Sequence, residues 1–258
     1  HPNIVTIDGS GEAQGLAYIA MEFVAGTDLT AFTQTPHLLP VAQVLAIGAR
    51  VASALDYAHA KHVVHRDVKP ANIMWDPATD TVKVMDFGVA RITDASKTRT
   101  GIVLGTPSFM SPEQLCGAKV DGRTDLYALG VTLFQLLTGA LPLRAESMPE
   151  LMHKIVHVPA PDVRTLRPDL PEAVATLVAK ALNKRPEDRY QTGAQLAQAL
   201  THAMDNALQQ SIGEVTAAVV YDPDRSPAEQ NMLLTKTTVL EHPQQQSPAS
   251  RPVAAPVG

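Results

Sequence analysis

The sequence predicts an α+β fold in which short strands come first and a mostly helical part follows. Two observations carry this prediction. Apolar runs at residues 4–7 and 16–23 are short and bounded by turn residues, as strands are. From residue 40 onward, apolar residues recur at helical spacing over longer segments. The 258 residues are 45% hydrophobic, so the chain can bury a core that fits one large domain or two modest ones.

Composition and charge exclude several functional classes. A net charge of -5 gives no basic field for nucleic acid. The single cysteine, Cys116, cannot form an internal disulfide, which suits a reducing, cytoplasmic location. No apolar run approaches the roughly 18 residues of a membrane span. Because the chain opens at His1 without Met or leader, we expect it to be part of a longer protein. That protein could be tethered to a membrane by a segment outside these residues, with this part of the chain in the cytoplasm.

The first half contains two strand predictions, one helix and one hairpin. The glycine-rich letters "DGSGEAQG" at residues 8–15 predict a turn between the first strands. Residues 40–62 predict a helix with one apolar stripe. That stripe consists of Val44, Ile47, Val51, Leu55 and Ala58. Residues 73–75 and 82–85 predict a hairpin closed by "DPATD".

The second half is predicted to be helical and to end in a tail. Residues 125–137 are apolar on all sides, as expected of a buried helix. Further helices are predicted over 171–182 and 192–208. Residues 206–258 are rich in Pro, Gln and Ser without a sustained apolar period, which indicates a flexible tail or linker after a domain at 1–205.

Three polar motifs occur in a fixed order within this frame. They are "HRDVKPAN" at residues 65–72, "DFG" at 86–88 and "GTPSFMSPEQL" at 105–115. Together with "MEFVAG" before them and "RPEDRY" after them, they resemble the eukaryotic-like protein kinases, most closely the bacterial serine/threonine branch. The resemblance covers about residues 4–200. It implies a kinase-like α+β fold with the helical C-lobe, the hinge and residual N-lobe strands.

The resemblance implies ATP-dependent phosphoryl transfer with Mg²⁺. Asp67 would accept the proton of the substrate hydroxyl or orient that hydroxyl. Lys69 would offset the charge of the transferring group. Asn72 and Asp86 would supply oxygen ligands to Mg²⁺, a hard cation. Gly88 would let the backbone bend sharply after Asp86.

The same resemblance implies the substrate class and the nucleotide contacts. Lys69, two residues after Asp67, marks serine/threonine kinases, and Thr106 would hydrogen-bond to both. Protein substrates with Ser or Thr are therefore the expected partners. The expected nucleotide contacts are the gatekeeper Met21, the backbone of Glu22 and Val24 at the adenine edge, Asp28 at the ribose and Met74 below the base.

Other residues are implied to support or switch the site. Glu113 would pair with a buried Arg189, and Asp125 would hold the backbone of the catalytic loop. A stacked spine would consist of Ile7, His65 and Phe87. Arg66 would bind a phosphorylated activation loop, with autophosphorylation, and so self-association, at Thr98 and Thr100.

The sequence departs from the family at its start. It has no G-x-G-x-x-G loop, no strand with the V-A-I-K lysine and no glutamate from the helix that follows this strand in the family. The letters "HPNIV" resemble the segment directly after that helix. We therefore expect an N-terminally truncated kinase domain that binds ATP poorly alone. A truncated pseudokinase that acts as a binding scaffold is the alternative. A small-molecule phosphotransferase is a third, disfavoured by the peptide-platform letters "GTPSFMSPE".

Overall fold

The computed structural model describes residues 1–87 and 107–220, with side chains described up to residue 206. Contacts divide the chain into two units, His1–Leu208 and Gln209–Gly258. The first unit contains all of the described strands and mixes helix with sheet, so the predicted α+β class is confirmed. The functional boundary near residue 205 stays a prediction.

The N-terminal hairpin consists of β1 (Ile7–Ala13) and β2 (Leu16–Met21), which pair antiparallel. The prediction of a turn over residues 8–15 was wrong, because most of that segment is strand. The turn is confined to Gln14 and Gly15, whose φ angles of 55° and 75° lie in the left-handed region. Two such residues suit the twist of a tight hairpin, and glycine adopts this conformation without strain.

A second sheet lies against the helices and has the order β3-β4-β5. Its strands are β3 (Thr27–Asp28), β4 (Ile73–Asp76) and β5 (Thr81–Val84), all antiparallel. The predicted hairpin is therefore confirmed. The first predicted strand is not one, because Ile4 makes only an isolated parallel bridge to Val84.

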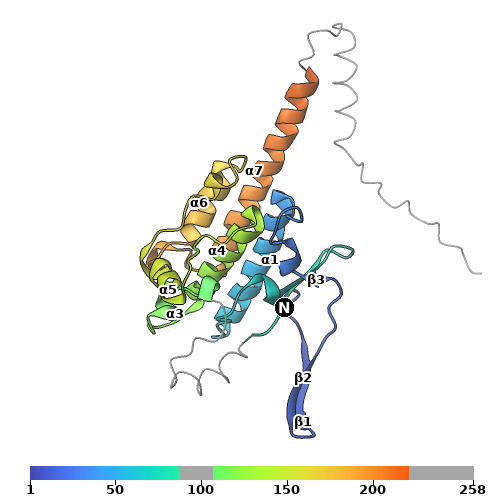
Figure 1. Cartoon of the computed structure of the whole chain (residues 1–258). Coiled ribbons are helices and arrows are strands. Elements are labelled where there is room, and N and C mark those ends of the chain that lie inside the picture. Colours follow the sequence, from blue (N-terminus) through green and yellow to red (C-terminus); the bar gives the residue numbers. More distant parts are fainter. Residues whose placement is uncertain (88–106, 221–258) are drawn as a thin grey trace, which may run out of the picture. The chain divides into compact units, whose positions relative to one another are not determined.

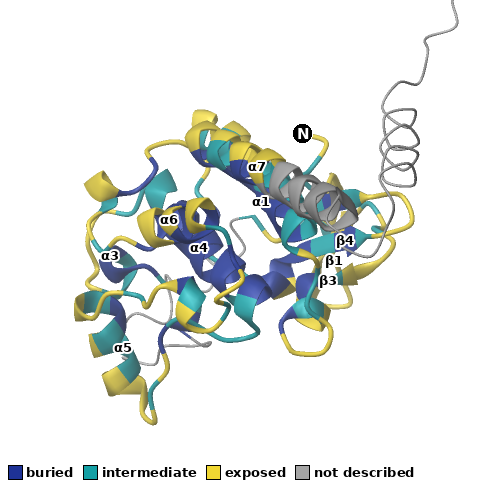
Figure 2. Ribbon diagram, turned by 90° about the horizontal axis from the view of Figure 1, so that it is seen from above, coloured by how far each residue is buried: buried dark blue, intermediate teal, exposed yellow. Residues whose placement is uncertain are grey.

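Helices α1 (Val41–Ala60) and α4 (Gly122–Thr138) form the centre of the core. Figure 1 shows them side by side, and in Figure 2 α4 is almost entirely buried. The all-round apolar pattern predicted this burial. A side chain at Gly48 of α1 would come within 2.8 Å of Leu133 of α4, so glycine permits the close approach.

The other helices surround this pair. They are α3 (Pro112–Leu115), α5 (Met148–His157), α6 (Glu172–Ala181) and α7 (Gly193–Val220). The short 3₁₀ turns are η1 (Leu29–Phe32), η2 (Pro70–Asn72), η3 (Pro107–Phe109), η4 (Val163–Thr165) and η5 (Pro186–Asp188). Helices α3 and α5 were not predicted from the sequence.

Helix α7 corrects the predicted end of the helical part. It continues past residue 208 to Val220, so the predicted tail begins as helix. A helix needs no apolar stripe to keep its backbone hydrogen bonds, and no proline interrupts the segment before Pro223. Among the described helices, none combines the length and apolar character that a membrane crossing requires.

Candidate active site

The loop between α1 and η2 is held by one buried carboxylate from α4. Asp125 is fully buried and accepts hydrogen bonds from two successive backbone N–H groups. The His65 N–H donates to its Oδ2 at 2.8 Å, and the Arg66 N–H donates to its Oδ1 at 2.7 Å. The ring of His59, in the last turn of α1, lies with Nε2 at 2.7 Å from Asp125 Oδ2. This carboxylate therefore fixes the backbone directly before Asp67.

Asp67 and Lys69 form an ion pair at the end of this loop. Lys69 Nζ lies 2.7 Å from Asp67 Oδ2, and the Asn72 amide donates to the same oxygen at 3.0 Å and to the Asp67 carbonyl at 2.8 Å. The Asp67 side chain is still 44% exposed. Within the described part of the chain, Asp67 Oδ1 and Asn72 Oδ1 accept no hydrogen bond, so both can meet an incoming group.

Asp86 follows β5 and lies on the segment that contacts this loop. The His65 ring nitrogen Nε2 is 2.7 Å from the Met85 carbonyl, and the Met85 N–H donates to the Asn72 carbonyl at 2.9 Å. Asp86 itself is exposed and has a φ of 60°. Strained backbone of this kind concentrates at functional sites. These contacts bring the segment of Asp86 against that of Asn72.

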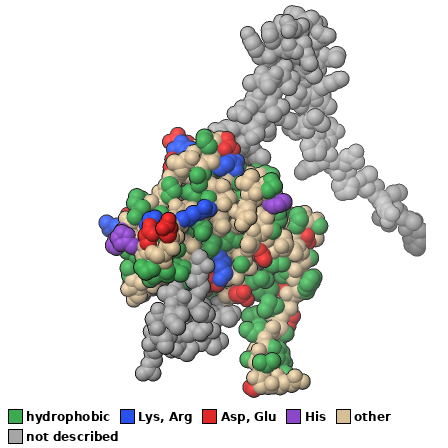
Figure 3. All heavy atoms as spheres, in the orientation of Figure 1, with side chains coloured by type: hydrophobic (Ala, Val, Ile, Leu, Met, Phe, Trp, Pro, Cys, Tyr) green, Lys and Arg blue, Asp and Glu red, His purple; other side chains and the backbone are tan. Residues whose placement is uncertain are grey.

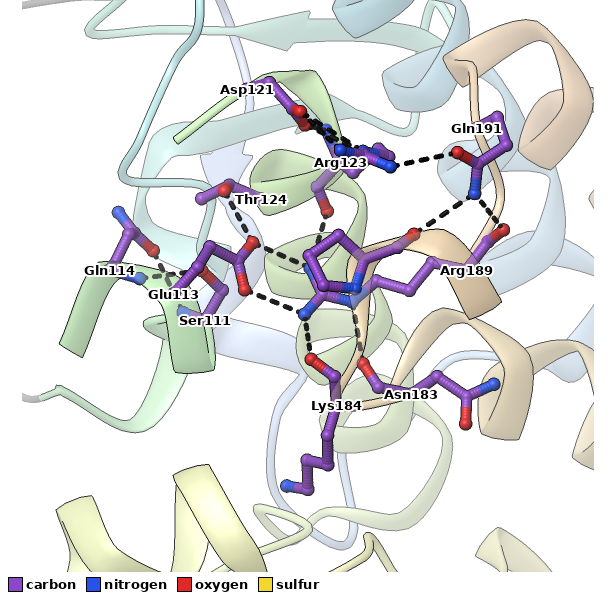
Figure 4. A network of polar contacts seen from close by, with 11 residues as sticks. Ser111, Glu113, Gln114, Asp121, Arg123, Thr124, Asn183, Lys184, Arg189 and Gln191 are labelled. Atoms are coloured by element: carbon purple, nitrogen blue, oxygen red, sulfur yellow. Dashed lines mark hydrogen bonds and ion pairs between the residues drawn. The ribbon is translucent and has the colours of Figure 1, made fainter. Parts of the chain in front are cut away.

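A buried ion pair connects α3, which follows the site in sequence, to the segment after η5. Arg189 and Glu113 make two parallel contacts of 2.8 Å, and the Thr124 hydroxyl donates to Glu113 at 2.7 Å. Figure 4 shows the two side chains facing each other, with the carbonyls of Asn183 and Lys184 also accepting from Arg189. Burial acts to raise the pKa of Glu113, but the bonds from Arg189 and Thr124 outweigh it and lower that pKa.

Glu22 and Asp28, two of the residues expected at the nucleotide, follow β2 and are both held by hydrogen bonds. The Glu22 N–H donates to the Thr6 carbonyl at 3.0 Å, and its carboxylate accepts from Lys83 Nζ at 2.7 Å. The bond from Lys83, followed by the backbone bond from Thr6, lowers the pKa of Glu22. Asp28 pairs with Met74 in the β3–β4 register, and its Oδ1 caps η1 by accepting from the Thr30 N–H at 2.8 Å.

The protein kinase domain family matches residues 1–204. The chain belongs to the protein kinase family. The serine/threonine-protein kinase pkn3 of Myxococcus xanthus is 44% identical over 73% of this chain and 37% of its own length. The chain spans 32% to 51% of the curated relatives PknB of Mycobacterium leprae and PknF of Mycobacterium tuberculosis.

Solved kinase structures have the same fold. The kinase domain of Mycobacterium tuberculosis PknI is 35% identical, with a TM-score of 0.61 over 79% of this chain and 73% of that one. Rad53 in complex with AMP-PNP is 25% identical, with a TM-score of 0.66 over 79% of this chain and 51% of that one. The kinase-like fold predicted from the motifs is therefore confirmed.

The predicted spine is found in part, and four predicted site residues are not described by the structure. His65 and Phe87 stack with ring centroids 4.5 Å apart. Ile7 is 59% exposed at the start of β1, so the stack among the described residues contains only the other two members. Gly88, Thr98, Thr100 and Thr106 lie outside the described residues.

The donor set of the kinase domain fits Mg²⁺ bound together with a nucleotide. The described residues contain no group of three or more acidic, histidine or cysteine side chains that could hold a metal ion alone. Mg²⁺ keeps several waters and takes one or two protein ligands beside substrate phosphates. Asn72 Oδ1 and the exposed Asp86 carboxylate are two such oxygens.

Three polar residues make contacts in this kinase domain that were not predicted from the sequence. His59, in the last turn of α1, contacts Asp125. Thr124 binds Glu113, and the Gln114 amide reaches the Arg66 carbonyl at 3.0 Å. The pattern Ser111-x-x-Gln114, which is typical of a helix start, could have identified Gln114.

Proposed function

We propose that this chain carries the catalytic groups of an ATP-dependent kinase that phosphorylates Ser and Thr hydroxyls of proteins. One observation carries the proposal. The Asp67 carboxylate is fixed by Lys69 and Asn72 on a loop whose backbone is clamped by Asp125, and no described residue donates to its second oxygen. Such rigid placement is what phosphoryl transfer asks of a protein, because that reaction depends on positioning and charge.

Each group has a distinct role in the transfer. Asp67 Oδ1 orients the substrate hydroxyl and takes its proton. At the same time the hydroxyl oxygen bonds to the γ-phosphorus of ATP, and ADP leaves. The Lys69 ammonium stays beside the transferring group and offsets its negative charge. Asn72 and Asp86 would hold Mg²⁺, which supplies charge neutralisation at the phosphates when it is bound.

The proposed nucleotide contacts come from β2, β3 and β4 and from the segment that joins β2 to β3. The Glu22 carbonyl and the Val24 N–H would meet the adenine edge, since the hydrogen bonds between Glu22 and Thr6 use the Glu22 N–H and carboxylate and not its carbonyl. Met21 would line the back of the base and Met74 its floor. Asp28 lies beside Met74 in the sheet, and with Oδ1 used as a helix cap its second oxygen would reach the ribose.

Substrate class and switching are proposed from the residues around Asp67. Lys69 and Thr106 favour a hydroxyl of Ser or Thr over Tyr. Phosphate on Thr98 or Thr100 would bind Arg66 after transfer between two copies of the chain. The reducing conditions suited to Cys116, which is exposed and free, and the need for ATP favour the cytoplasm.

A scaffold function is the second candidate. The 258 residues contain no G-x-G-x-x-G motif, and the β1–β2 hairpin exposes apolar side chains. Those side chains include Leu16 at 73% exposure, and Phe23, which follows β2, is 93% exposed. Without donors for the α- and β-phosphates, these residues alone would bind ATP poorly and transfer slowly.

Phosphate transfer from labelled ATP with Mg²⁺, to a basic acceptor protein and to the chain itself, tests the proposal. Asp67→Asn should lower the rate by about a hundredfold or more. Asp76→Asn is the matched control, because that carboxylate, at the end of β4, accepts hydrogen bonds from Ala78 and Thr79 in the β4–β5 turn. No transfer by the unmodified chain, even after fusion to a glycine-rich lobe, would favour the scaffold.

A further inference from the structure

Gln114 joins the short helix α3 to the loop that carries Asp67. Its side-chain oxygen Oε1 accepts from the Ser111 N–H at 2.9 Å, and its Nε2 donates to the Arg66 carbonyl at 3.0 Å. The two ends of one half-buried amide therefore connect segments that are 48 residues apart in sequence.

The helix cap accounts for only one of these two contacts. In a capping box the third residue of the helix must supply an acceptor to the N-cap N–H, and Glu or Gln serves equally well. Ser111 completes that box by accepting from the Gln114 N–H at 3.4 Å. Only an amide can also donate, so the contact with Arg66 is a separate reason for Gln at this position.

The carbonyl that Gln114 binds belongs to the peptide that joins Arg66 to Asp67. On the other side of the same residue, the Arg66 N–H donates to Asp125 at 2.7 Å. Arg66 has a φ of 70°, a left-handed conformation that costs a non-glycine residue of the order of 1–3 kcal/mol. Such a conformation persists only when its surroundings fix it, and here α4 fixes one side and α3 the other.

We propose that Gln114 is a positioning residue that fixes the Arg66–Asp67 peptide through its amide N–H and thereby orients the Asp67 carboxylate. Among the described residues, Gln114 is the only hydrogen-bond donor to that carbonyl. The inference deepens the proposed function, since the role of Asp67 rests on it. It also connects α3, which begins within the letters "GTPSFMSPE" of the expected peptide platform, to the catalytic loop.

Gln114→Glu separates the donor from the cap. The variant keeps the size of the side chain and the acceptor for the Ser111 N–H, but it places an acceptor opposite the Arg66 carbonyl. Gln195→Glu is the matched control, because Gln195 Oε1 also accepts a backbone N–H, that of Gln191 at 2.9 Å. Both variants would be made in the 258-residue chain.

The first measurement is hydrogen exchange of the Asp67 backbone amide by NMR. We expect exchange about tenfold faster in Gln114→Glu and unchanged in Gln195→Glu, as expected for the loss of one hydrogen bond. Unchanged exchange at Asp67 in Gln114→Glu would overturn the proposal. Equal acceleration throughout α3 and α4 would also overturn it, because that result would indicate a general loss of stability.

The second measurement is phosphate transfer, which distinguishes this inference from the proposed function. Gln114→Glu should lower kcat by about tenfold and leave KM for ATP unchanged, since one orienting hydrogen bond is lost. Faster exchange at Asp67 in a chain that transfers no phosphate, even after fusion to a glycine-rich lobe, would support the positioning contact and count against the proposed function. An unchanged kcat in an active chain would overturn the positioning role.

Discussion

Two pairs of carboxylates in this domain have opposite surroundings. Glu113 and Asp125 are 9% and 0% exposed, and every one of their oxygens accepts a hydrogen bond. Asp67 and Asp86 lie at the surface, and within the described residues Asp67 keeps one oxygen without a donor. The buried pair holds the backbone in place, and the exposed pair is thereby left available for chemistry.

Removal of an anchoring carboxylate should have the largest effect on stability. Glu113→Ala leaves Arg189 buried without its counter-ion, so we expect the free energy of unfolding to fall by about 3–5 kcal/mol. Urea denaturation measures this loss. Glu150→Ala is the control, since its pair with Lys154 is exposed and contributes little to stability. Similar losses in the two variants would contradict the distinction between anchor and surface.

A smaller effect should appear at Lys184, a cation at the edge of the same anchor. Its Nζ donates to the Ile155 carbonyl at 2.7 Å, and burial, followed by the charge of Arg189, lowers its pKa to about 8. Between that value and the ordinary 10.5, the unfolded chain binds the proton and the folded chain does not, so this contribution to stability rises with pH.

Urea denaturation of the wild type and Lys184→Met checks this sign. The unfolding free energy of the wild type should rise relative to that of Lys184→Met between about pH 7 and about pH 9.5. Lys119→Met changes an exposed lysine in the same manner and is the control. A flat or falling curve for Lys184→Met would show that the ammonium is not disfavoured in the folded domain.

The smallest effect is expected on the β1–β2 hairpin, which lacks buried anchors. Every residue of β2 is exposed, and hydrophobic side chains cover much of the hairpin surface (Figure 3). Leu16→Ser should therefore change the free energy of unfolding by no more than about 0.5 kcal/mol. Leu133→Ser, in the core, is the contrast, and a comparable loss in the two variants would show that the hairpin is packed in solution.

The sequence predicted much of the fold because its strongest signals are local. The all-round apolar run of α4 and the turn letters before β5 depend only on neighbouring residues. The hairpin at β1 was mispredicted because its glycines resemble a turn, whereas cross-strand pairing decided the outcome. Helix α5 was missed although its local signal is clear. After the N-cap Ser147, apolar residues recur at three- and four-residue steps from Met148 to Val156, and this pattern was not used.

The site was predictable where motif letters fix the residue types, and less so where contacts cross the fold. The pairing of Glu113 with Arg189 followed from the family resemblance. The contacts of His59 with Asp125 and of Gln114 with Arg66 join residues 66 and 48 positions apart, so no local pattern reveals them. The exposure of Ile7 likewise depends on what covers the hairpin, which a one-dimensional pattern does not contain.

The clamp by Asp125 also has a consequence for how the domain folds. Its bonds to His65 and Arg66 close loops of 60 and 59 residues, and the Arg189–Glu113 pair closes one of 76. Closing such loops costs chain entropy before any contact compensates, and contacts of this range slow folding. During refolding, α1 should therefore gain helical structure early, and the strained turn at Arg66 should form among the last steps, after α4 has docked.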